Sequence, residues 1–267
     1  MENTALRGIL FDLDGVIYLG DDMIPGAGDT LDWVRSQNIP HLFVTNTTSR
    51  PREALSGKLA AMGIGVDPDD ILSPPLAAAN WLQANTAAPA ALYVPDATRV
   101  EFEHLRLWAG DPAETVGAVV LGDLGERWDF ARLNQAFLLL MQQSAPPLVA
   151  LGMTRFWRAA DGLRLDAGPF VAALEYATGR SAVVMGKPAE AFFHSGADIL
   201  GIGAAQLLMI GDDIRGDVNG AQKAGLKAAL VKTGKFRPQD LESGHPPDAV
   251  LASIADLPRW WEAQLPA

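Results

Sequence analysis

The sequence contains no cysteine among its 267 residues. This absence excludes disulfide bonds, catalysis by a thiolate and metal sites built from cysteine sulfur. It also fits a reducing compartment, which is the first of two grounds for expecting a cytoplasmic protein.

Basic residues are few compared with acidic ones. The chain has 21 Lys and Arg against 32 Asp and Glu, which gives a formal net charge of -11. A generic nucleic-acid binder shows the opposite balance, so we expect no nucleic-acid partner. An anionic substrate must instead be met by a local positive field, either from a few chosen basic groups or from a metal ion.

Long apolar runs are also missing. No stretch approaches the ~20 consecutive apolar residues of a membrane helix. The first residues, MENTALRGILFDLDG, do not resemble a signal peptide, because the apolar run is short and acids interrupt it. We therefore expect a cytoplasmic monomer or homodimer with no membrane partner. With 49% apolar and 20% charged residues, the chain suits a protein with a real core.

Both ends of the chain alternate between strand and helix patterns. The expected strands cover residues 9–11, 41–45, 181–185, 206–210 and 227–231. The expected helices between them cover residues 27–37, 49–62, 188–200 and 217–224. Such alternation predicts βαβ units and a parallel sheet.

The middle of the chain predicts a second α/β unit inserted into the first. Its expected strands are residues 90–94, 117–122 and 147–152, and its expected helices are 129–143 and 168–179. We expect a core of residues 1–82 and 179–267, interrupted by a domain of residues 83–178. The predicted fold class is α/β, with a Rossmann-like parallel-sheet core and an inserted α/β domain.

Two aspartates, Asp12 and Asp14, follow the first apolar strand. Residues i and i+2 of an extended chain point to the same side, so the two carboxylates can face one site. Their repulsion is costly unless one is protonated or a cation lies between them, and a hard divalent cation suits oxygen ligands. The plain alternative is a strand ending in a polar turn at Gly15. An EF-hand loop is rejected, because it needs glycine at its sixth position.

Polar residues also follow two other predicted strands. Thr45, Asn46 and Thr47 come after HLFV, where hydroxyls and free backbone N–H groups can bind an anion. The alternative is a simple helix cap, which Ser49 alone would supply. Lys187 follows SAVVM and precedes a proline, so it can place an ammonium over a site, although a single lysine is usually a solvated surface charge.

Three acids crowd the turn after QLLMI: Asp212, Asp213 and Asp217. Asp217 would lie near the start of the next helix, where the helix dipole favours a negative charge. Helix capping by Asp212 or Asp213 is the plain alternative, but it would not explain all three acids.

All four of these motifs follow an apolar strand that leads into a helix. In an open parallel sheet, the carboxyl ends of the strands converge on one crevice. Two acid clusters, a hydroxyl and a lysine around one crevice suit phosphoryl transfer, in which cations neutralise phosphate oxygens and a carboxylate can attack phosphorus.

On these residues the sequence resembles the haloacid dehalogenase-like superfamily, on its phosphatase side. The family motifs match, in order, at Asp12-Leu13-Asp14-Gly15, Thr45, Lys187, Gly211-Asp212 and Asp217. The inserted block resembles the type-2 cap domain of subfamily IIA. GLRLDAGPFVAALEYATG, GKPAEAFFHSGA and the stretch from MIGDDIRGD to GKFRP are similar to a smaller group within that branch.

The resemblance implies a Mg²⁺-dependent phosphatase that acts on a small phosphorylated substrate. Asp12 would be the nucleophile that forms an aspartyl-phosphate. Asp14 would protonate the leaving oxygen and then deprotonate the attacking water, which requires a carboxyl that changes its protonation state. Asp14 also distinguishes a phosphatase from the haloacid dehalogenases, which lack this second aspartate.

The remaining motif residues would bind the ion and the phosphoryl group. The resemblance implies that the Asp12 carboxylate, the Asp14 backbone carbonyl and Asp212 hold Mg²⁺. Asp213 or Asp217 would orient water molecules bound to the ion. Thr45, Asn46 and Lys187 would hold the phosphoryl oxygens. Thr45 and Lys187 would be catalytic residues, and Leu13 and Thr47 would join Asn46 and Lys187 in binding the substrate.

Two other classes of function are weighed against this one. A receiver-type signalling module also carries acids, a threonine and a Lys-Pro on an α/β sheet, but it is about half as long and its Lys-Pro follows all its acids. An inactive homologue that only binds phosphate or a partner is the other alternative. Every motif position here carries a competent residue, so nothing in the sequence supports inactivation.

Overall fold

The computed structural model describes residues 5–159, 162–242 and 245–264, and the chain forms two compact units. The first unit consists of the described residues within Met1–Thr45, Arg52–Leu72 and Lys187–Ala267. The second consists of those within Asn46–Pro51 and Ser73–Gly186. The boundaries expected for the inserted domain, residues 83–178, stay a prediction.

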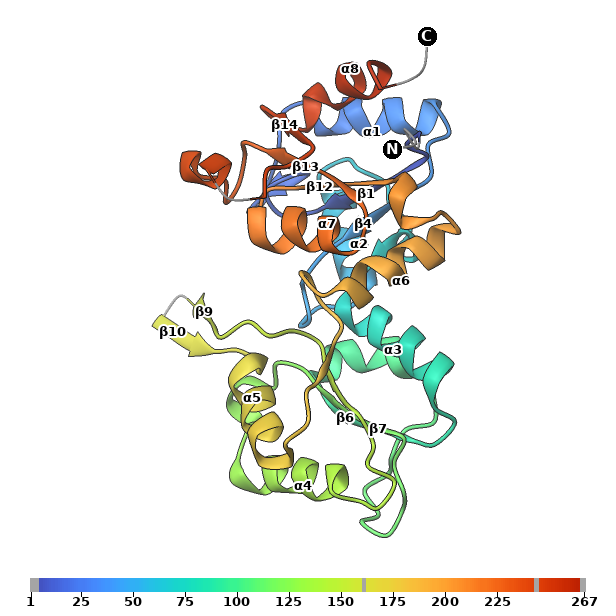
Figure 1. The fold of residues 1–267 in the computed structure, drawn as a ribbon, viewed down its shortest axis with the longest axis vertical. Coiled ribbons are helices and arrows are strands. Elements are labelled where there is room, and N and C mark those ends of the chain that lie inside the picture. The colour runs from blue at the N-terminus through green and yellow to red at the C-terminus, as the bar shows by residue number, and fades with distance from the viewer. Residues whose placement is uncertain (1–4, 160–161, 243–244, 265–267) are drawn as a thin grey trace. The chain divides into compact units, whose positions relative to one another are not determined.

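The first unit is built on a six-stranded sheet with the order β14-β13-β12-β1-β4-β5, and every neighbouring pair is parallel (Figure 1). The strands are β1 (Gly8–Asp12), β4 (His41–Val44), β5 (Ile71–Leu72), β12 (Leu207–Gly211), β13 (Lys227–Val231) and β14 (Ala249–Leu251). The predicted parallel α/β core is confirmed.

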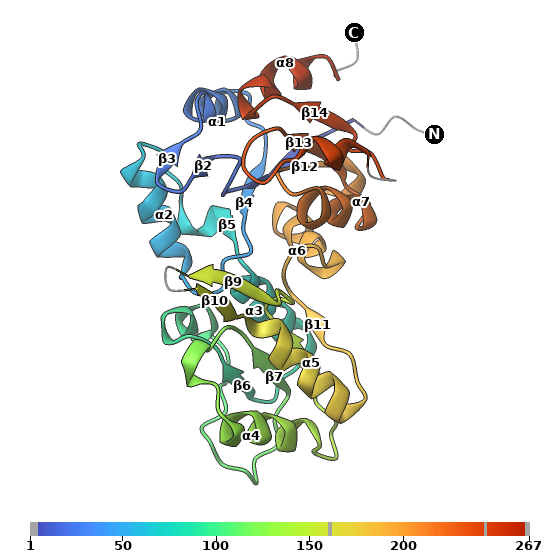
Figure 2. The same cartoon turned by 90° about the vertical axis from the view of Figure 1, so that its left-hand side faces the viewer.

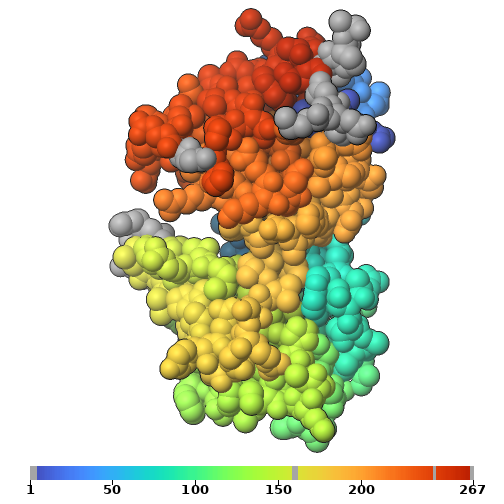
Figure 3. Space-filling model, in the orientation of Figure 1, coloured from blue at the N-terminus to red at the C-terminus, as the bar shows by residue number. Residues whose placement is uncertain are grey.

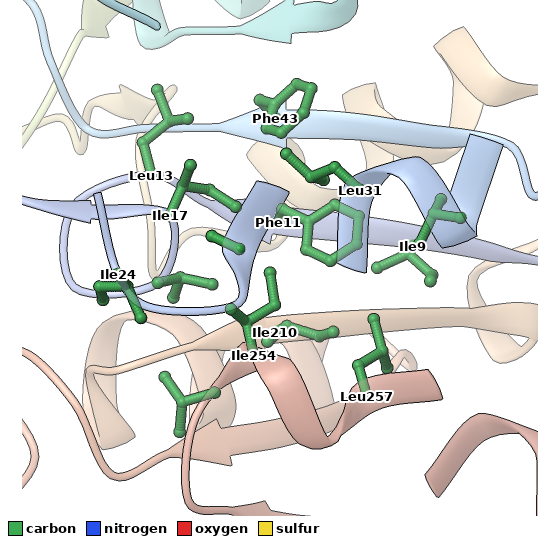
Figure 4. Close-up of a cluster of buried hydrophobic side chains, with 14 of the residues drawn as sticks. Ile9, Phe11, Leu13, Ile17, Ile24, Leu31, Phe43, Ile210, Ile254 and Leu257 are labelled. Carbon is green, nitrogen blue, oxygen red and sulfur yellow. The ribbon is translucent and has the colours of Figure 1, made fainter. Parts of the chain in front are cut away.

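Helices cover both faces of this sheet, because its central strands are apolar on both sides. All five residues of β1 are buried, as expected in a parallel sheet. Ile9 and Phe11 point into a cluster that also holds side chains of α1 (Ala27–Ser36), α2 (Arg52–Ala61) and α8 (Leu257–Glu262) (Figure 4). Leu10 packs on the opposite face, near Gly196 of α6 (Glu190–Leu200). Figure 2 shows α6 and α7 (Gly220–Lys223) across the sheet from α1 and α8.

Short elements complete the first unit. A two-stranded antiparallel hairpin, β2 (Tyr18–Leu19) and β3 (Asp22–Met23), follows β1 directly. Lys58 of α2 anchors it, because its Nζ donates to the Gly20 carbonyl at 2.7 Å and lies 4.1 Å from the centre of the Tyr18 ring. Short 3-10 helices cover Pro68–Asp70, Ala204–Gln206, Pro238–Glu242 and Ile254–Asp256, and a π-helical segment covers Ile214–Asn219. In Figure 3 the C-terminal part of the chain, coloured orange to red, forms one face of this unit.

The second unit has its own four-stranded parallel sheet and its own core. The sheet order is β11-β8-β7-β6, formed by β6 (Ala90–Tyr93), β7 (Ala118–Leu121), β8 (Leu148–Ala150) and β11 (Val183–Val184). Apolar residues of α4 (Phe130–Leu140) and α5 (Ala167–Thr178) pack on one face of it, and α3 (Pro74–Asn85) also belongs to this unit. Asp129 caps the start of α4, and Gly179 ends α5 in the left-handed conformation.

The remaining elements of this unit are a hairpin, β9 (Phe156–Ala159) with β10 (Gly162–Leu165), and 3-10 helices at Asp96–Phe102 and Gly125–Arg127. In the part of the chain that the structure describes, no helix combines the length and apolar character needed to cross a bilayer.

Two sequence expectations differ from the structure. The strand expected over residues 181–185 is confined to Val183–Val184, and it pairs with β8 of the second unit instead of joining the core sheet. An apolar β-branched pair suits either sheet, so the pattern indicated a strand without indicating its partner. The helix expected over residues 217–224 begins as the π-helical segment and becomes α-helical only at Gly220.

Candidate active site

Strand order brings the polar segments of the first unit together. Asp12 is the last residue of β1, and its strand neighbour in β4 is Val44, which Thr45 follows directly. On the other side of β1, Phe11 pairs with Ile210 of β12. That strand ends at Gly211, and Asp212 follows it directly. Because the three strands are parallel, Asp12, Thr45 and Asp212 leave the sheet at the same edge.

Three carboxylates form a buried cluster at this edge. Asp12, Asp212 and Asp217 are 6%, 1% and 1% exposed, and each offers an oxygen within 4.8 Å of the others. Like charges this close cannot all ionise without a compensating cation. The local structure therefore requires either bound positive charge or bound protons.

Lys187 supplies part of that positive charge. Its Nζ lies 2.7 Å from Asp12 Oδ1 and 2.7 Å from Asp217 Oδ1, and the residue is only 8% exposed. Burial alone lowers the pKa of this lysine, but the adjacent carboxylates raise it, and the net shift is upward. Lys187 thus remains an ammonium at neutral pH and bridges two of the three acids.

One ammonium does not balance the cluster. Burial, followed by the charges of Asp217 and Asp212, raises the pKa of Asp12 from its usual 3.8 to about 7, although Lys187 opposes the shift. Burial and the charge of Asp217 raise the pKa of Asp212 to about 6, against the lowering effect of the Lys235 backbone N–H. Without a further cation, the cluster therefore competes for protons near neutral pH.

The residues present suit a divalent cation. Among the described residues, Asp212 Oδ1 is buried and has no hydrogen-bond partner, whereas Oδ2 accepts the Lys235 N–H at 2.6 Å. An unpartnered carboxylate oxygen beside the buried Asp12 and Asp217 gives an all-oxygen donor set, which Mg²⁺ prefers. Asp12 and Asp212 are the side chains that would hold the ion.

Asp213 and Asp217 occupy different environments. The Asp213 side chain accepts the N–H groups of Arg215 at 3.0 Å and Gly216 at 2.9 Å, so it caps the π-helical segment. Burial alone raises its pKa, but the Gly216 N–H, Lys235 and the Arg215 N–H reverse the shift, and the carboxyl titrates below its usual range. Asp217 Oδ2 accepts the Asp213 N–H at 3.1 Å, while Oδ1 contacts Lys187 within the cluster.

The other predicted site residues of the first unit differ in exposure. Leu13 is fully buried in the hydrophobic cluster shown in Figure 4, so only its backbone can contact a ligand. Asp14 is exposed and forms a β-bridge with Tyr18. Thr45 is 6% exposed, and its N–H donates to the Leu72 carbonyl at 3.1 Å. Asn46 and Thr47 belong to the second unit, and their contact with a phosphoryl group stays a prediction.

Sequence reasoning missed Lys235, whose backbone holds Asp212 and whose Nζ lies 3.6 Å from Asp213 Oδ2. The signal was available, because the polar segment Lys232-Thr233-Gly234-Lys235 follows the apolar strand β13 in the same way as the four recognised motifs follow their strands.

Two family models match the chain. Residues 9–105 match a haloacid dehalogenase-like hydrolase model, and residues 184–257 match a second haloacid dehalogenase hydrolase-like model. The first match contains Asp12, Asp14 and Thr45, and the second contains Lys187, Asp212 and Asp217.

Relatives match over nearly the whole chain. The human phospholysine phosphohistidine inorganic pyrophosphate phosphatase is 37% identical over 241 residues, which cover 89% of this chain and 87% of that protein. The human haloacid dehalogenase-like hydrolase domain-containing protein 2 is 38% identical over 243 residues, covering 91% and 90%. The p-nitrophenyl phosphatase from Archaeoglobus fulgidus, a solved structure, matches with a TM-score of 0.84 and 26% identity over 97% of this chain and 99% of that one. The chain therefore belongs to the haloacid dehalogenase-like hydrolases, as a phosphatase-type member of subfamily IIA.

Proposed function

We propose that this protein is a Mg²⁺-dependent phosphatase that hydrolyses a small phosphorylated molecule through an aspartyl-phosphate on Asp12. The observation that carries the proposal is the buried cluster of Asp12, Asp212 and Asp217, bridged by Lys187 at 2.7 Å. Buried like charges are costly, and ionisable groups with strongly shifted pKa values cluster at functional sites.

In the first step, an Asp12 carboxylate oxygen attacks phosphorus. The new oxygen–phosphorus bond forms as the bond from phosphorus to the leaving-group oxygen breaks. Asp14, which is exposed and directly precedes the turn at Gly15, gives its proton to the departing oxygen. The products of this step are the dephosphorylated leaving group and an acyl phosphate on Asp12.

In the second step, water attacks the phosphorus of the aspartyl-phosphate. Asp14 takes a proton from that water, and the bond between phosphorus and the Asp12 oxygen breaks. Inorganic phosphate leaves, Asp12 is again a carboxylate and Asp14 is again protonated. The cycle therefore consumes one water and needs no other reactant.

The surrounding groups neutralise charge and hold the phosphoryl oxygens. Mg²⁺ held by Asp12 and Asp212 would supply positive charge that offsets the carboxylates and polarises the phosphoryl group. Lys187 orients Asp12 through its 2.7 Å contact and adds a second positive charge. Thr45, with Asn46, Thr47 and the backbone at Leu13, would donate hydrogen bonds to the phosphoryl oxygens.

Substitution of the nucleophile tests the mechanism. Asp12→Asn keeps the shape of the side chain and its ability to accept a hydrogen bond from Lys187, but an amide is a poor nucleophile. We expect hydrolysis of p-nitrophenyl phosphate with Mg²⁺ to fall by at least ~10³-fold, while circular dichroism is unchanged. Asp32→Asn, at an exposed position of α1, is the control and should keep wild-type activity. An Asp12→Asn protein with wild-type turnover would refute the mechanism.

The substrate class is the open part of the proposal. The name of the human relative includes phospholysine, phosphohistidine and inorganic pyrophosphate, so a panel should compare phosphoramidates and pyrophosphate with sugar phosphates, nucleotides and pyridoxal phosphate. Phosphate release with saturating Mg²⁺ or with EDTA gives the specificity and the metal requirement together. If every compound were hydrolysed as fast in EDTA as in Mg²⁺, the result would contradict a metal-dependent phosphatase.

A cytoplasmic location and a monomeric or homodimeric state belong to the same proposal. The absence of cysteine supports the location, because it suits a reducing compartment. Fractionation of the cells that produce the protein tests its location, and light scattering of the purified protein tests its oligomeric state.

A further inference from the structure

The loop Thr233-Gly234-Lys235, which follows β13, closes around the carboxylate of Asp212. The backbone N–H of Lys235 donates to Asp212 Oδ2 at 2.6 Å. The other oxygen of the same carboxylate, Oδ1, is buried without a hydrogen-bond partner among the described residues. The loop therefore occupies one oxygen of Asp212 and leaves the other available to a ligand.

Two glycines allow this close approach. Gly234 has φ +58°, and a Cβ built there would lie 2.0 Å from Asp212 Oδ2 and 2.6 Å from the Cα of Gly15. Gly15 has φ +89°, and a Cβ built on it would also lie 2.0 Å from Asp212 Oδ2. Asp212 is thus enclosed between two backbone segments that only glycine can form without displacing it.

Thr233 connects the loop to the segment that carries the nucleophile. Its Oγ1 donates a hydrogen bond to the carbonyl oxygen of Gly15. Gly15 is three residues from Asp12 and directly follows Asp14. Through Thr233 and Gly15, the loop links the position of Asp212 to that of the catalytic turn.

We propose that Thr233, Gly234 and Lys235 form a positioning loop that holds Asp212 with its Oδ1 directed to the divalent cation. The same loop fixes the position of Asp212 relative to the segment Asp12–Gly15. The inference rests on the proposed metal-dependent function. Groups that orient a metal ligand typically change metal affinity or activity about 10–100-fold when removed. A loop with a purely structural role would change stability and leave the affinity for Mg²⁺ unaltered.

Removal of one hydroxyl is the mildest test. Thr233→Val keeps the volume of the side chain but loses the hydrogen bond to Gly15, and we expect Mg²⁺ to bind the metal-free protein about tenfold more weakly in calorimetric titration. Thr233→Ser keeps the hydroxyl and should restore most of the affinity. Thr30→Val is the matched control, because the buried Thr30 hydroxyl also donates to a backbone carbonyl, that of Ile254, at 3.3 Å.

A second pair of variants separates backbone strain from displacement of Asp212. Gly234→Ala introduces a Cβ against Asp212, whereas Gly201→Ala introduces one at φ +63° with no atom within 4 Å. We expect both variants to lose thermal stability, and only Gly234→Ala to lose Mg²⁺ affinity.

The outcomes separate the inference from the function on which it rests. Wild-type affinity in both Thr233→Val and Gly234→Ala would overturn the positioning role while leaving the phosphatase proposal intact. Should Gly234→Ala fail to fold, Thr233→Val with its serine and Thr30 comparisons decides alone. A wild-type protein that binds no Mg²⁺ would overturn both proposals.

Discussion

Lys187 is a buried cation that contacts two carboxylates of the cluster. It is almost fully buried, and it forms ion pairs with Asp12 and Asp217, which belong to a group of three close carboxylates. Burial of charged groups costs free energy that is recovered only when each charge is well paired. The lysine therefore both stabilises the site and determines which Asp12 oxygen is directed away from it.

Removal of this ammonium should destabilise the fold. In Lys187→Met, the carboxylates lose their buried counter-charge, and we expect the free energy of unfolding in EDTA at pH 7.5 to fall by about 3–5 kcal/mol. Turnover should fall by at least about 10²-fold, because a donor to the reacting group is lost. Urea unfolding and a p-nitrophenyl phosphate assay measure the two effects.

Lys227→Met provides the comparison for that variant. Lys227 pairs with Asp248 at 2.9 Å, but its side chain is 58% exposed, so the loss should stay below about 1 kcal/mol. Equal stability of the two methionine variants would contradict the role assigned to the buried pair.

Among the elements of the fold, the segments that follow the strands determine the site. The end of β1 carries Asp12, and the segment after it carries Asp14. The segment after β12 carries Asp212, Asp213 and Asp217, and the loop after β13 supports Asp212. The π-helical segment Ile214–Asn219 is part of this arrangement, since its first turn is capped by Asp213 and it presents Asp217 to the cluster. The regular strands and helices hold these segments in register.

Loss of the cap on this segment should affect both stability and chemistry. Asp213→Ala removes the acceptor for the Arg215 and Gly216 N–H groups, and we expect a loss of about 0.5–2 kcal/mol. Because the segment carries Asp217, kcat/KM should also fall. Asp129→Ala, which removes the cap of α4 in the second unit, should cost similar stability and leave kcat/KM unchanged. An Asp213→Ala enzyme with wild-type kcat/KM would show that the segment does not need its cap for catalysis.

At the scale of the whole molecule, the site makes stability depend on pH and metal. In the metal-free folded protein, the pKa is about 7 for Asp12 and about 6 for Asp212, compared with the usual 3.8. Both carboxyls therefore bind protons more tightly than they do in the unfolded chain. The folded state then holds protons that the unfolded state has released. This contribution to stability is fully present below pH ~4 and is lost as the pH rises through about 7.

Magnesium should compensate for that loss. We expect the melting temperature in EDTA to decrease between pH 5 and pH 8 by more in the wild type than in Asp12→Asn, because a tenfold difference in proton affinity between the folded and unfolded states corresponds to about 1.4 kcal/mol of stability. Saturating Mg²⁺ should raise the melting temperature more at pH 8 than at pH 5, since the ion competes with protons. Thermal unfolding at several pH values, with Mg²⁺ or EDTA, measures both effects. A stabilisation by Mg²⁺ that is independent of pH would contradict protonation of the cluster.

The sequence by itself determined the α/β class, the parallel core sheet and the chemical types at the ends of its strands. Strand and helix periodicity and the order of Asp12, Thr45, Lys187 and Asp212 are local properties of the chain, and local patterns are readable without a structure.

Only the tertiary structure decided which strands pair and which side chains contact one another. It assigned Val183–Val184 to the sheet of the second unit, directed the Leu13 side chain into the core, brought the Asp217 carboxylate beside Asp12 and placed the Lys235 N–H against Asp212. Each of these contacts joins residues that are distant in the chain or turns a side chain toward one of two available environments. The local sequence pattern is compatible with either contact, and the packing of the complete chain selects one of them.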